Sequence, residues 1–121
     1  MTSNHRSLQD STTTLPTSSG DRDFEIEFDA PGLSSTNSTH ARPYLSYRVN
    51  PGDDSGVNVV IELNSTVVVD PTIDTTVSRQ FNEIFDHGLL QATGNELRVF
   101  VPTNEPGTVS VSDLIVVYPE A

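Results

Sequence analysis

Hydrophobic and polar residues alternate strictly in the segment DFEIEFD, residues 23–29. Phe24, Ile26 and Phe28 fall on one side of an extended chain, and the acidic residues between them fall on the other. A period of two is typical of a β-strand with one face in a core and the other in water. The pattern therefore predicts a half-buried strand, which ends at the turn residues Pro31 and Gly32.

Further short segments with strand character follow along the chain. They lie at residues 43–50, 57–63, 66–70, 97–101 and 108–118. Asn64 and Ser65 separate two runs rich in valine and isoleucine, which predicts a hairpin. In the last segment the alternation set by Val109 and Val111 changes phase, and a β-bulge at Ser112-Asp113 would explain the change. About seven short strands with turns every 8 to 12 residues indicate an all-β fold, an antiparallel β-sandwich.

One segment favours a different structure. In RQFNEIF, residues 79–85, the residues Phe81, Ile84 and Phe85 are spaced at i, i+3 and i+4. This spacing predicts a short helix or helical turn, with a strand as the alternative.

The first 22 residues are mainly Ser, Thr, Asn, Gly and Pro and contain two isolated leucines. Such a composition buries too little apolar surface to offset the entropy of ordering. We expect residues 1–22 to be a polar N-terminal arm, disordered alone or ordered by assembly, and residues 23–121 to be the sandwich domain. If the arm is an assembly strap and not a passive tail, its contacts are Leu8, Leu15 and Pro16.

The charge balance narrows the classes of partner. Seventeen acidic residues oppose six basic ones, all of them arginine, and the formal net charge is −11. Scattered single arginines argue against nucleic acid and against an anionic membrane surface, because both need clustered positive charge. An acidic chain without lysine is typical of halophilic proteins, whose surface repulsion is screened by salt. A GC-rich genome or ordinary acidic solubility would give a similar composition.

The remaining sequence signals bear on location and chemistry. No apolar run reaches the roughly 20 residues of a membrane span, and the N-terminus has no signal-peptide core. We therefore expect a virion or an extracellular assembly that is reached without a signal peptide. Cysteine is absent, so disulfides and thiolate metal sites are excluded.

The second half of the chain resembles galactose-binding-like jelly-roll domains. The residues that carry the resemblance are FNEIF at 81–85, GLLQATGNELRVFV at 88–101 and VSDLIVVY at 111–118. The resemblance implies a structural turn at Gly94-Asn95, with Leu90 and Leu97 buried and Asp86, His87 and Gly88 in a loop. Such domains occur in carbohydrate-binding modules, in accessory domains of glycoside hydrolases and in structural proteins of viruses.

Sites for chemistry are few. His87 beside Asp86 is a candidate for catalysis, but no hydroxyl has a recognisable nucleophile setting, so we expect no catalytic residues and no enzyme activity. We also predict no cofactor and no metal. Asp53 and Asp54 could ligate calcium, although PGDDSG is typical of a turn. Glycosylation triplets begin at Asn37 and Asn64.

These observations lead to a non-enzymatic structural subunit of a virus particle from a halophilic host: a capsid decoration, turret or spike, or tail component. Its expected partners are copies of itself and other virion proteins. The alternative is a carbohydrate- or glycan-binding module with contacts in the loops at 34–42 and 51–56. The chain has no Trp, and the strand patterns place Tyr44, Tyr47 and Tyr118 in core or interface packing, which weighs against sugar binding. A third possibility is an accessory domain of an enzyme.

Overall fold

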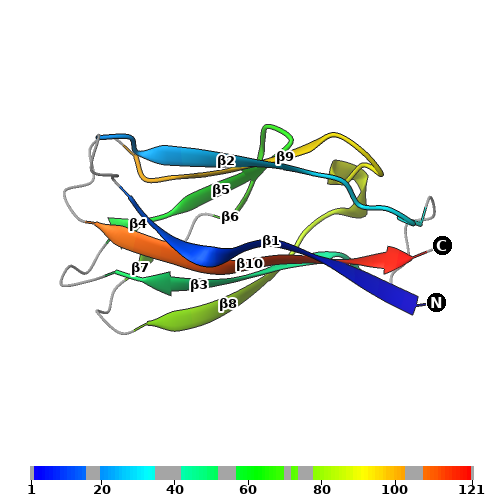
Figure 1. The fold of residues 1–121 in the computed structure, drawn as a ribbon, viewed down its shortest axis with the longest axis horizontal. Coiled ribbons are helices and arrows are strands. Elements are labelled where there is room, and N and C mark those ends of the chain that lie inside the picture. The colour runs from blue at the N-terminus through cyan, green and yellow to red at the C-terminus, as the bar shows by residue number, and fades with distance from the viewer. Residues whose placement is uncertain are drawn as a thin grey trace.

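The computed structural model shows two antiparallel sheets packed face to face (Figure 1). It describes residues 2–15, 20–34, 42–51, 57–69, 72–73, 78–102 and 108–120. One sheet has the strand order β1-β10-β3-β8 and is called here the β3 sheet; the other has the order β2-β9-β5-β6 and is called the β9 sheet. The predicted antiparallel β-sandwich is confirmed.

Most elements are short and lie at the predicted segments, with additions, whereas β1 and β10 have 14 and 12 residues. The strands are β1 (Thr2–Leu15), β2 (Asp23–Phe28), β3 (Tyr44–Asn50), β4 (Val57–Asn58), β5 (Val60–Leu63), β6 (Thr66–Val69), β7 (Thr72–Ile73), β8 (Arg79–Ile84), β9 (Asn95–Phe100) and β10 (Val109–Glu120). One 3-10 helix, η1 (His87–Leu89), precedes β9, and β4 pairs with β7 beside the two sheets. No helix in the part of the chain that the structure describes is long and apolar enough to cross a membrane.

The core lies between the two sheets and is built by alternation. Every second residue of β3 is buried, and β9 has the same period. The largest side chains that are fully buried are Tyr47, Tyr118, Leu15, Leu45, Ile61, Leu63, Leu97 and Leu114. The core is therefore mainly aliphatic and includes Tyr47 and Tyr118, which confirms the packing role predicted for these two tyrosines.

The N-terminal segment differs from the expected arm. Thr2–Leu15 forms β1, an edge strand that pairs antiparallel with β10 from Thr2 opposite Glu120 to Leu15 opposite Val109. Its backbone groups pair with β10, so a polar sequence can be ordered here with few apolar anchors. The expectation of an unstructured or partner-ordered arm is thus wrong for residues 2–15, which order within the chain's own sandwich.

Residues 79–85 also correct a prediction. Residues 79–84 form strand β8, the stated alternative, instead of a helical turn, and they pair with β3 without a register shift. Phe81 stacks on the buried Tyr47 with the ring centroids 5.4 Å apart, whereas Ile84 is 67% exposed. Pairing with β3 places Phe81 and Ile84 on opposite faces, and this pairing outweighs the local helical spacing.

Two predicted irregularities are confirmed. Asn64 and Ser65 both have positive φ, as the hairpin turn between β5 and β6 requires. The register of β10 with β3 shifts between Ser112 and Ile115, and Asp113 has a φ of 55°. This bulge keeps Val111 and Leu114 both in the core, although they are three residues apart.

Candidate functional site

The segment 86–88 is a turn that leads into the sheet. Asp86 caps η1 by accepting a hydrogen bond from the Gly88 amide at 3.0 Å. His87 Nε2 lies 2.7 Å from the carbonyl oxygen of Ser34. A cavity of about 250 Å³ is lined by Arg42, Ile84, Phe85, Asp86 and His87. None of these described residues carries a hydroxyl or thiol for the histidine to activate.

The predicted turn at Gly94-Asn95 has a larger structural role than reversing the chain. Gly94 has a φ of +70°, which is compatible with the expected turn, and its amide donates to Asp29 Oδ1 at 2.9 Å. Asn95 is fully buried; its Nδ2 donates to the carbonyls of Gln91 and Phe28, at 2.6 Å and 3.3 Å. Its Oδ1 accepts from the Gln91 amide at 2.8 Å. The sequence prediction missed this polar cluster inside the fold.

Asn64 belongs to the same cluster. Its Nδ2 donates to the Leu89 carbonyl at 2.7 Å and to Asn95 Oδ1 at 3.1 Å, and its Oδ1 accepts from the Glu96 amide at 2.8 Å. A glycan on Nδ2 would replace one of its two donor hydrogens, so the glycosylation triplet at Asn64 would lose one of these bonds on modification. The triplet at Asn37 lies outside the described residues.

The predicted assembly contacts do not form one surface. Leu15 is fully buried in the chain's own core, so its predicted contact with a neighbouring subunit is wrong for this fold. Leu8 is partly buried and packs against the same core. Pro16 is not among the described residues, and neither are Asp53 and Asp54. No group of three or more His, Cys, Asp or Glu side chains that could hold a metal occurs within the described ranges.

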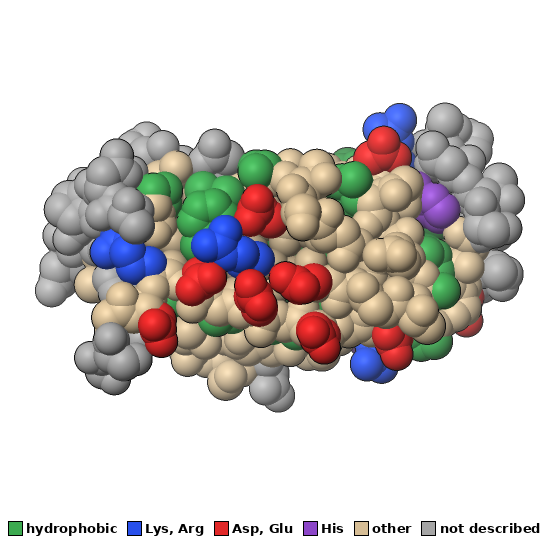
Figure 2. Space-filling model, turned by 90° about the horizontal axis from the view of Figure 1, so that it is seen from above, with side chains coloured by type: hydrophobic (Ala, Val, Ile, Leu, Met, Phe, Trp, Pro, Cys, Tyr) green, Lys and Arg blue, Asp and Glu red, His purple; other side chains and the backbone are tan. Residues whose placement is uncertain are grey.

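The outer face of the β9 sheet is acidic. Its carboxylates are Asp23, Glu25, Glu27, Glu62 and Glu96. Arg98 lies among them and donates to Asp23 Oδ2 at 3.0 Å and to Glu62 Oε1 at 3.1 Å. Its guanidinium also lies over the Phe100 ring, 4.2 Å from the centroid. Figure 2 looks onto this side, where acidic side chains gather around basic ones.

Hydrogen bonds to Asp23 and Glu62 raise the pKa of Arg98, so the guanidinium is charged at all physiological pH values. Its Nε and Nη1 donate to carboxylates within the protein, and the carboxylates around it repel anionic ligands. The acidic face therefore offers mainly hydrogen-bond acceptors, which suits it less to a neutral ligand that needs donors.

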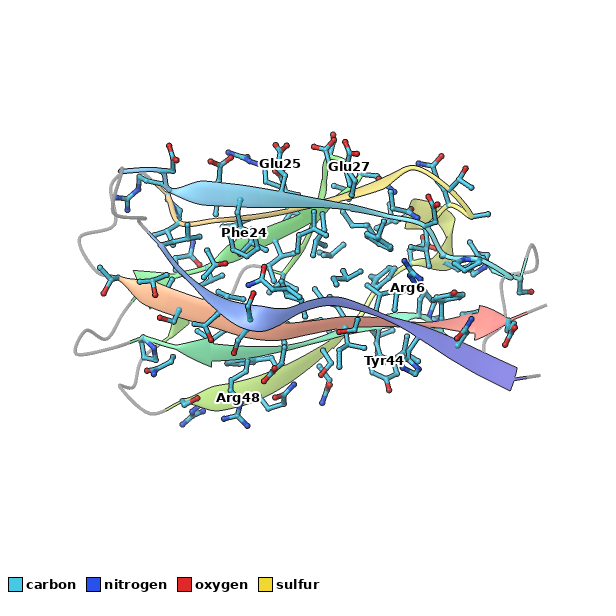
Figure 3. All side chains as sticks on the ribbon, in the orientation of Figure 1. Arg6, Phe24, Glu25, Glu27, Tyr44 and Arg48 are labelled. Carbon is cyan, nitrogen blue, oxygen red and sulfur yellow. The ribbon has the colours of Figure 1, made fainter. Side chains whose placement is uncertain are left out.

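The outer face of the β3 sheet has different chemistry. Its residues are Tyr44, Ser46, Arg48, Gln80, Asn82, Ile84, Ile115 and Val117, called here the Tyr44 face. Figure 3 shows Tyr44 and Arg48 on the side of this sheet that faces away from the β9 sheet, whereas Glu25 and Glu27 lie on the opposite outer face. The position of Tyr44 on this surface shows that the prediction of core packing is wrong for this tyrosine, and its packing in an interface stays a prediction.

Cross-strand pairing arranges the Tyr44 face in rows. Tyr44 lies opposite Ile84 on β8 and Val117 on β10, so an aromatic ring has aliphatic neighbours on both sides. One row along the sheet, Ser46 lies between Asn82 and Ile115. Neither the Tyr44 hydroxyl nor the Asn82 amide has a hydrogen-bond partner among the described residues, and both can bind a ligand.

The next row contains Gln80 opposite Arg48, and both side chains make hydrogen bonds to serine hydroxyls. Gln80 Nε2 donates to Ser46 Oγ at 2.7 Å, and Arg48 donates to Ser78 Oγ at 3.2 Å. Arg48 also lies 3.9 Å from Asp113 at the β10 bulge. These exposed contacts orient the side chains and leave most of their hydrogen-bonding capacity open to solvent.

Comparison with known proteins extends the description of the fold. No protein-family model and no curated protein matches the sequence. A solved structure of the CBM36-1 domain of a multidomain xylanase, from the hindgut metagenome of Trinervitermes trinervoides, is similar with a TM-score of 0.53 and 10% identity over 99% of each chain.

Two further structures are similar. A family 35 carbohydrate-binding module from an environmental isolate has a TM-score of 0.50 and 19% identity, over 83% of this chain and 72% of that one. The K1 cleaved adhesin domain of Lys-gingipain from Porphyromonas gingivalis W83 has a TM-score of 0.52 and 10% identity, over 100% of both chains. This chain therefore shares its β-sandwich fold with carbohydrate-binding modules and with a bacterial adhesin domain.

Proposed function

We propose that this protein is a non-catalytic glycan-binding module and that the Tyr44 face binds the glycan. The observation that carries the proposal is the row in which Tyr44 lies between Ile84 and Val117, next to Asn82, whose amide has no hydrogen-bond partner among the described residues. An aromatic ring with aliphatic neighbours packs against the C–H face of a sugar ring. Amide groups nearby donate to and accept from its hydroxyls.

The charge distribution favours a neutral glycan. The chain carries a formal net charge of −11, so uronic acids and sulfated sugars are repelled over a Debye length. On the Tyr44 face the polar groups are mainly amides and hydroxyls, and Arg48 lies close to Asp113. Neutral polysaccharides meet no such penalty there.

The proposal takes the alternative function over the virion subunit expected first. One of the observations behind that expectation was a strap at residues 1–22, and Thr2–Leu15 is instead an edge strand of the same sandwich. The similar structures add support for the alternative, because two of the three are carbohydrate-binding modules. A shared fold alone does not determine a function, so the assignment of glycan binding depends on the Tyr44 face.

The test is a screen of neutral and anionic polysaccharides on an array, followed by titration calorimetry with the best oligosaccharide. We expect binding to neutral glycans only. Tyr44→Ala should weaken it at least about tenfold, or about 1.4 kcal/mol, and Asn82→Ala should weaken it by a smaller factor.

The matched control is Phe100→Ala, which removes a half-exposed aromatic ring from the acidic face. This variant should bind as the wild type does. Absence of any neutral ligand, or a loss of binding in Phe100→Ala while Tyr44→Ala still binds, would refute the assignment.

A further inference from the structure

The two sheets have four edge strands, and three of them carry features that oppose pairing with another chain. β1 has two register irregularities in its pairing with β10. β2 carries Asp23, Glu25 and Glu27 in alternate positions, which repel a second copy. β6 has four residues and a register shift. Bulges, charges and short length are common ways to block edge-to-edge association.

The fourth edge strand, β8, has no register irregularity and no run of like charges, because its two charged residues, Arg79 and Glu83, have opposite signs. It pairs with β3 over six residues without a register shift and contains no proline. No described element pairs with its other side. Ile84, one of two large hydrophobic residues found exposed among the described residues, lies at its end. Figure 1 shows β8 as the last strand of the β3 sheet.

The direction of the backbone groups on β8 can be deduced. The Phe85 amide donates to the Pro43 carbonyl at 3.1 Å, in line with the register that pairs Ile84 with Tyr44. Backbone groups in an antiparallel strand alternate in direction from residue to residue. Odd-numbered residues of β8 therefore bond to β3, and the amide and carbonyl groups of Gln80, Asn82 and Ile84 point away from the sheet.

We propose that β8 pairs antiparallel with β8 of a second copy, about a two-fold axis at Phe81. In this register Gln80 lies opposite Asn82 of the second copy, and each pair can exchange two backbone hydrogen bonds. Arg79 lies opposite Glu83 of the second copy, and the same contact is repeated by symmetry. The two Phe81 rings meet at the axis in a pair without mutual backbone hydrogen bonds, where side chains approach closely.

Charge complementarity selects both the partner and the register. With the axis at Asn82, Glu83 would face Phe81, and with the axis at Gln80, Arg79 would face Phe81. Both of these registers separate Arg79 from Glu83, so only the Phe81 axis forms two ion pairs. An unrelated extended peptide would need its own matching charges, whereas a second copy supplies both.

The test is sedimentation velocity of the full chain over a range of concentrations, without any glycan present. The wild type should show a monomer–dimer equilibrium that becomes tighter with moderate salt, because screening reduces repulsion between two chains of net charge −11. Arg79→Glu alone and Glu83→Arg alone should each weaken the dimer at least tenfold. An equimolar mixture of the two variants should recover dimers, because both cross-strand pairs are then complementary.

A second variant tests the backbone contacts. Asn82→Pro removes an amide that points away from β3, so it should abolish the dimer while the monomer stays folded by circular dichroism. Asn82→Ala, which keeps the amide, is the matched control and should still dimerise. A wild type that is monomeric at all concentrations, or a dimer unaffected by both charge reversals and by Asn82→Pro, would overturn the proposal. Glycan binding is measured separately, so either proposal can fail alone.

Discussion

Replacement of Asn95 by alanine is expected to destabilise the fold by about 3 to 5 kcal/mol. The side chain is fully buried and makes four hydrogen bonds. Two are with the backbone N–H and C=O of Gln91, one is with the Phe28 carbonyl, and one is with the side-chain Nδ2 of Asn64. Each bond contributes about 0.5 to 1.5 kcal/mol net, and partners left buried without water add to the loss. Gln91 is exposed, so water can replace part of its bonding, which keeps the total below the sum of the largest values.

The matched control is Asn82→Ala, which removes the same amide from an exposed position on β8 and should change the unfolding free energy by less than about 0.5 kcal/mol. Urea unfolding followed by far-ultraviolet circular dichroism and tyrosine fluorescence measures both variants, because the chain has no tryptophan. The reasoning would be refuted if Asn95→Ala unfolded within about 1 kcal/mol of the wild type, because the buried cluster would then contribute little.

Four further outcomes are expected. Gly94→Val should lower the free energy of unfolding in urea by about 1 to 3 kcal/mol, because φ is +70° at this position. An added Cβ meets no atom within 4 Å, so the cost comes from the backbone and not from a clash. Unchanged unfolding would mean that this φ does not persist in solution. Tyr47→Phe should leave stability at neutral pH unchanged or raise it by up to about 1 kcal/mol, because the buried hydroxyl has no partner among the described residues; a loss above 1 kcal/mol would indicate a partner. Burial raises the pKa of Tyr47 above its usual 10, so the wild type should lose stability as the pH rises above 10, and this loss should be smaller in Tyr47→Phe. Raising KCl from about 0.1 to 2 M should raise the melting temperature, since salt screens repulsion on the acidic face. The increase should be smaller in the double variant Glu25→Gln/Glu27→Gln, which has less charge to screen. Equal increases in the two proteins would mean that salt acts by strengthening apolar burial.

The candidate site could be predicted only in part from the sequence. Tyr44 has the opposite parity to Leu45, Tyr47 and Val49, and this parity alone places it on the outer face once the strand is known. Its neighbours Ile84 and Val117 are 40 and 73 residues away in sequence and meet it only because β3 lies between β8 and β10. Strand order is a long-range property, so no local pattern could group these residues.

The sequence by itself determined most of the strands between residues 23 and 118, much of the core and the irregularities. Alternation gave the buried faces of β2 and β9, and the phase change at Ser112-Asp113 located the bulge. Each of these features depends on which side chains of a few consecutive residues enter the core. The local pattern of hydrophobic and polar residues shows this directly, because side chains in a strand alternate between its two faces.

Only the tertiary structure decided the states of the N-terminal segment and of residues 79–85. Thr2–Leu15 has little alternation and becomes a strand because the backbone of β10 offers it hydrogen-bond partners, with Leu15 buried at the end. Phe81 and Ile84 have helical spacing, yet pairing with β3 makes the segment extended. In both cases backbone pairing with a strand distant in sequence outweighs the local side-chain pattern, because unpaired backbone groups beside a core are costly whatever side chains they carry.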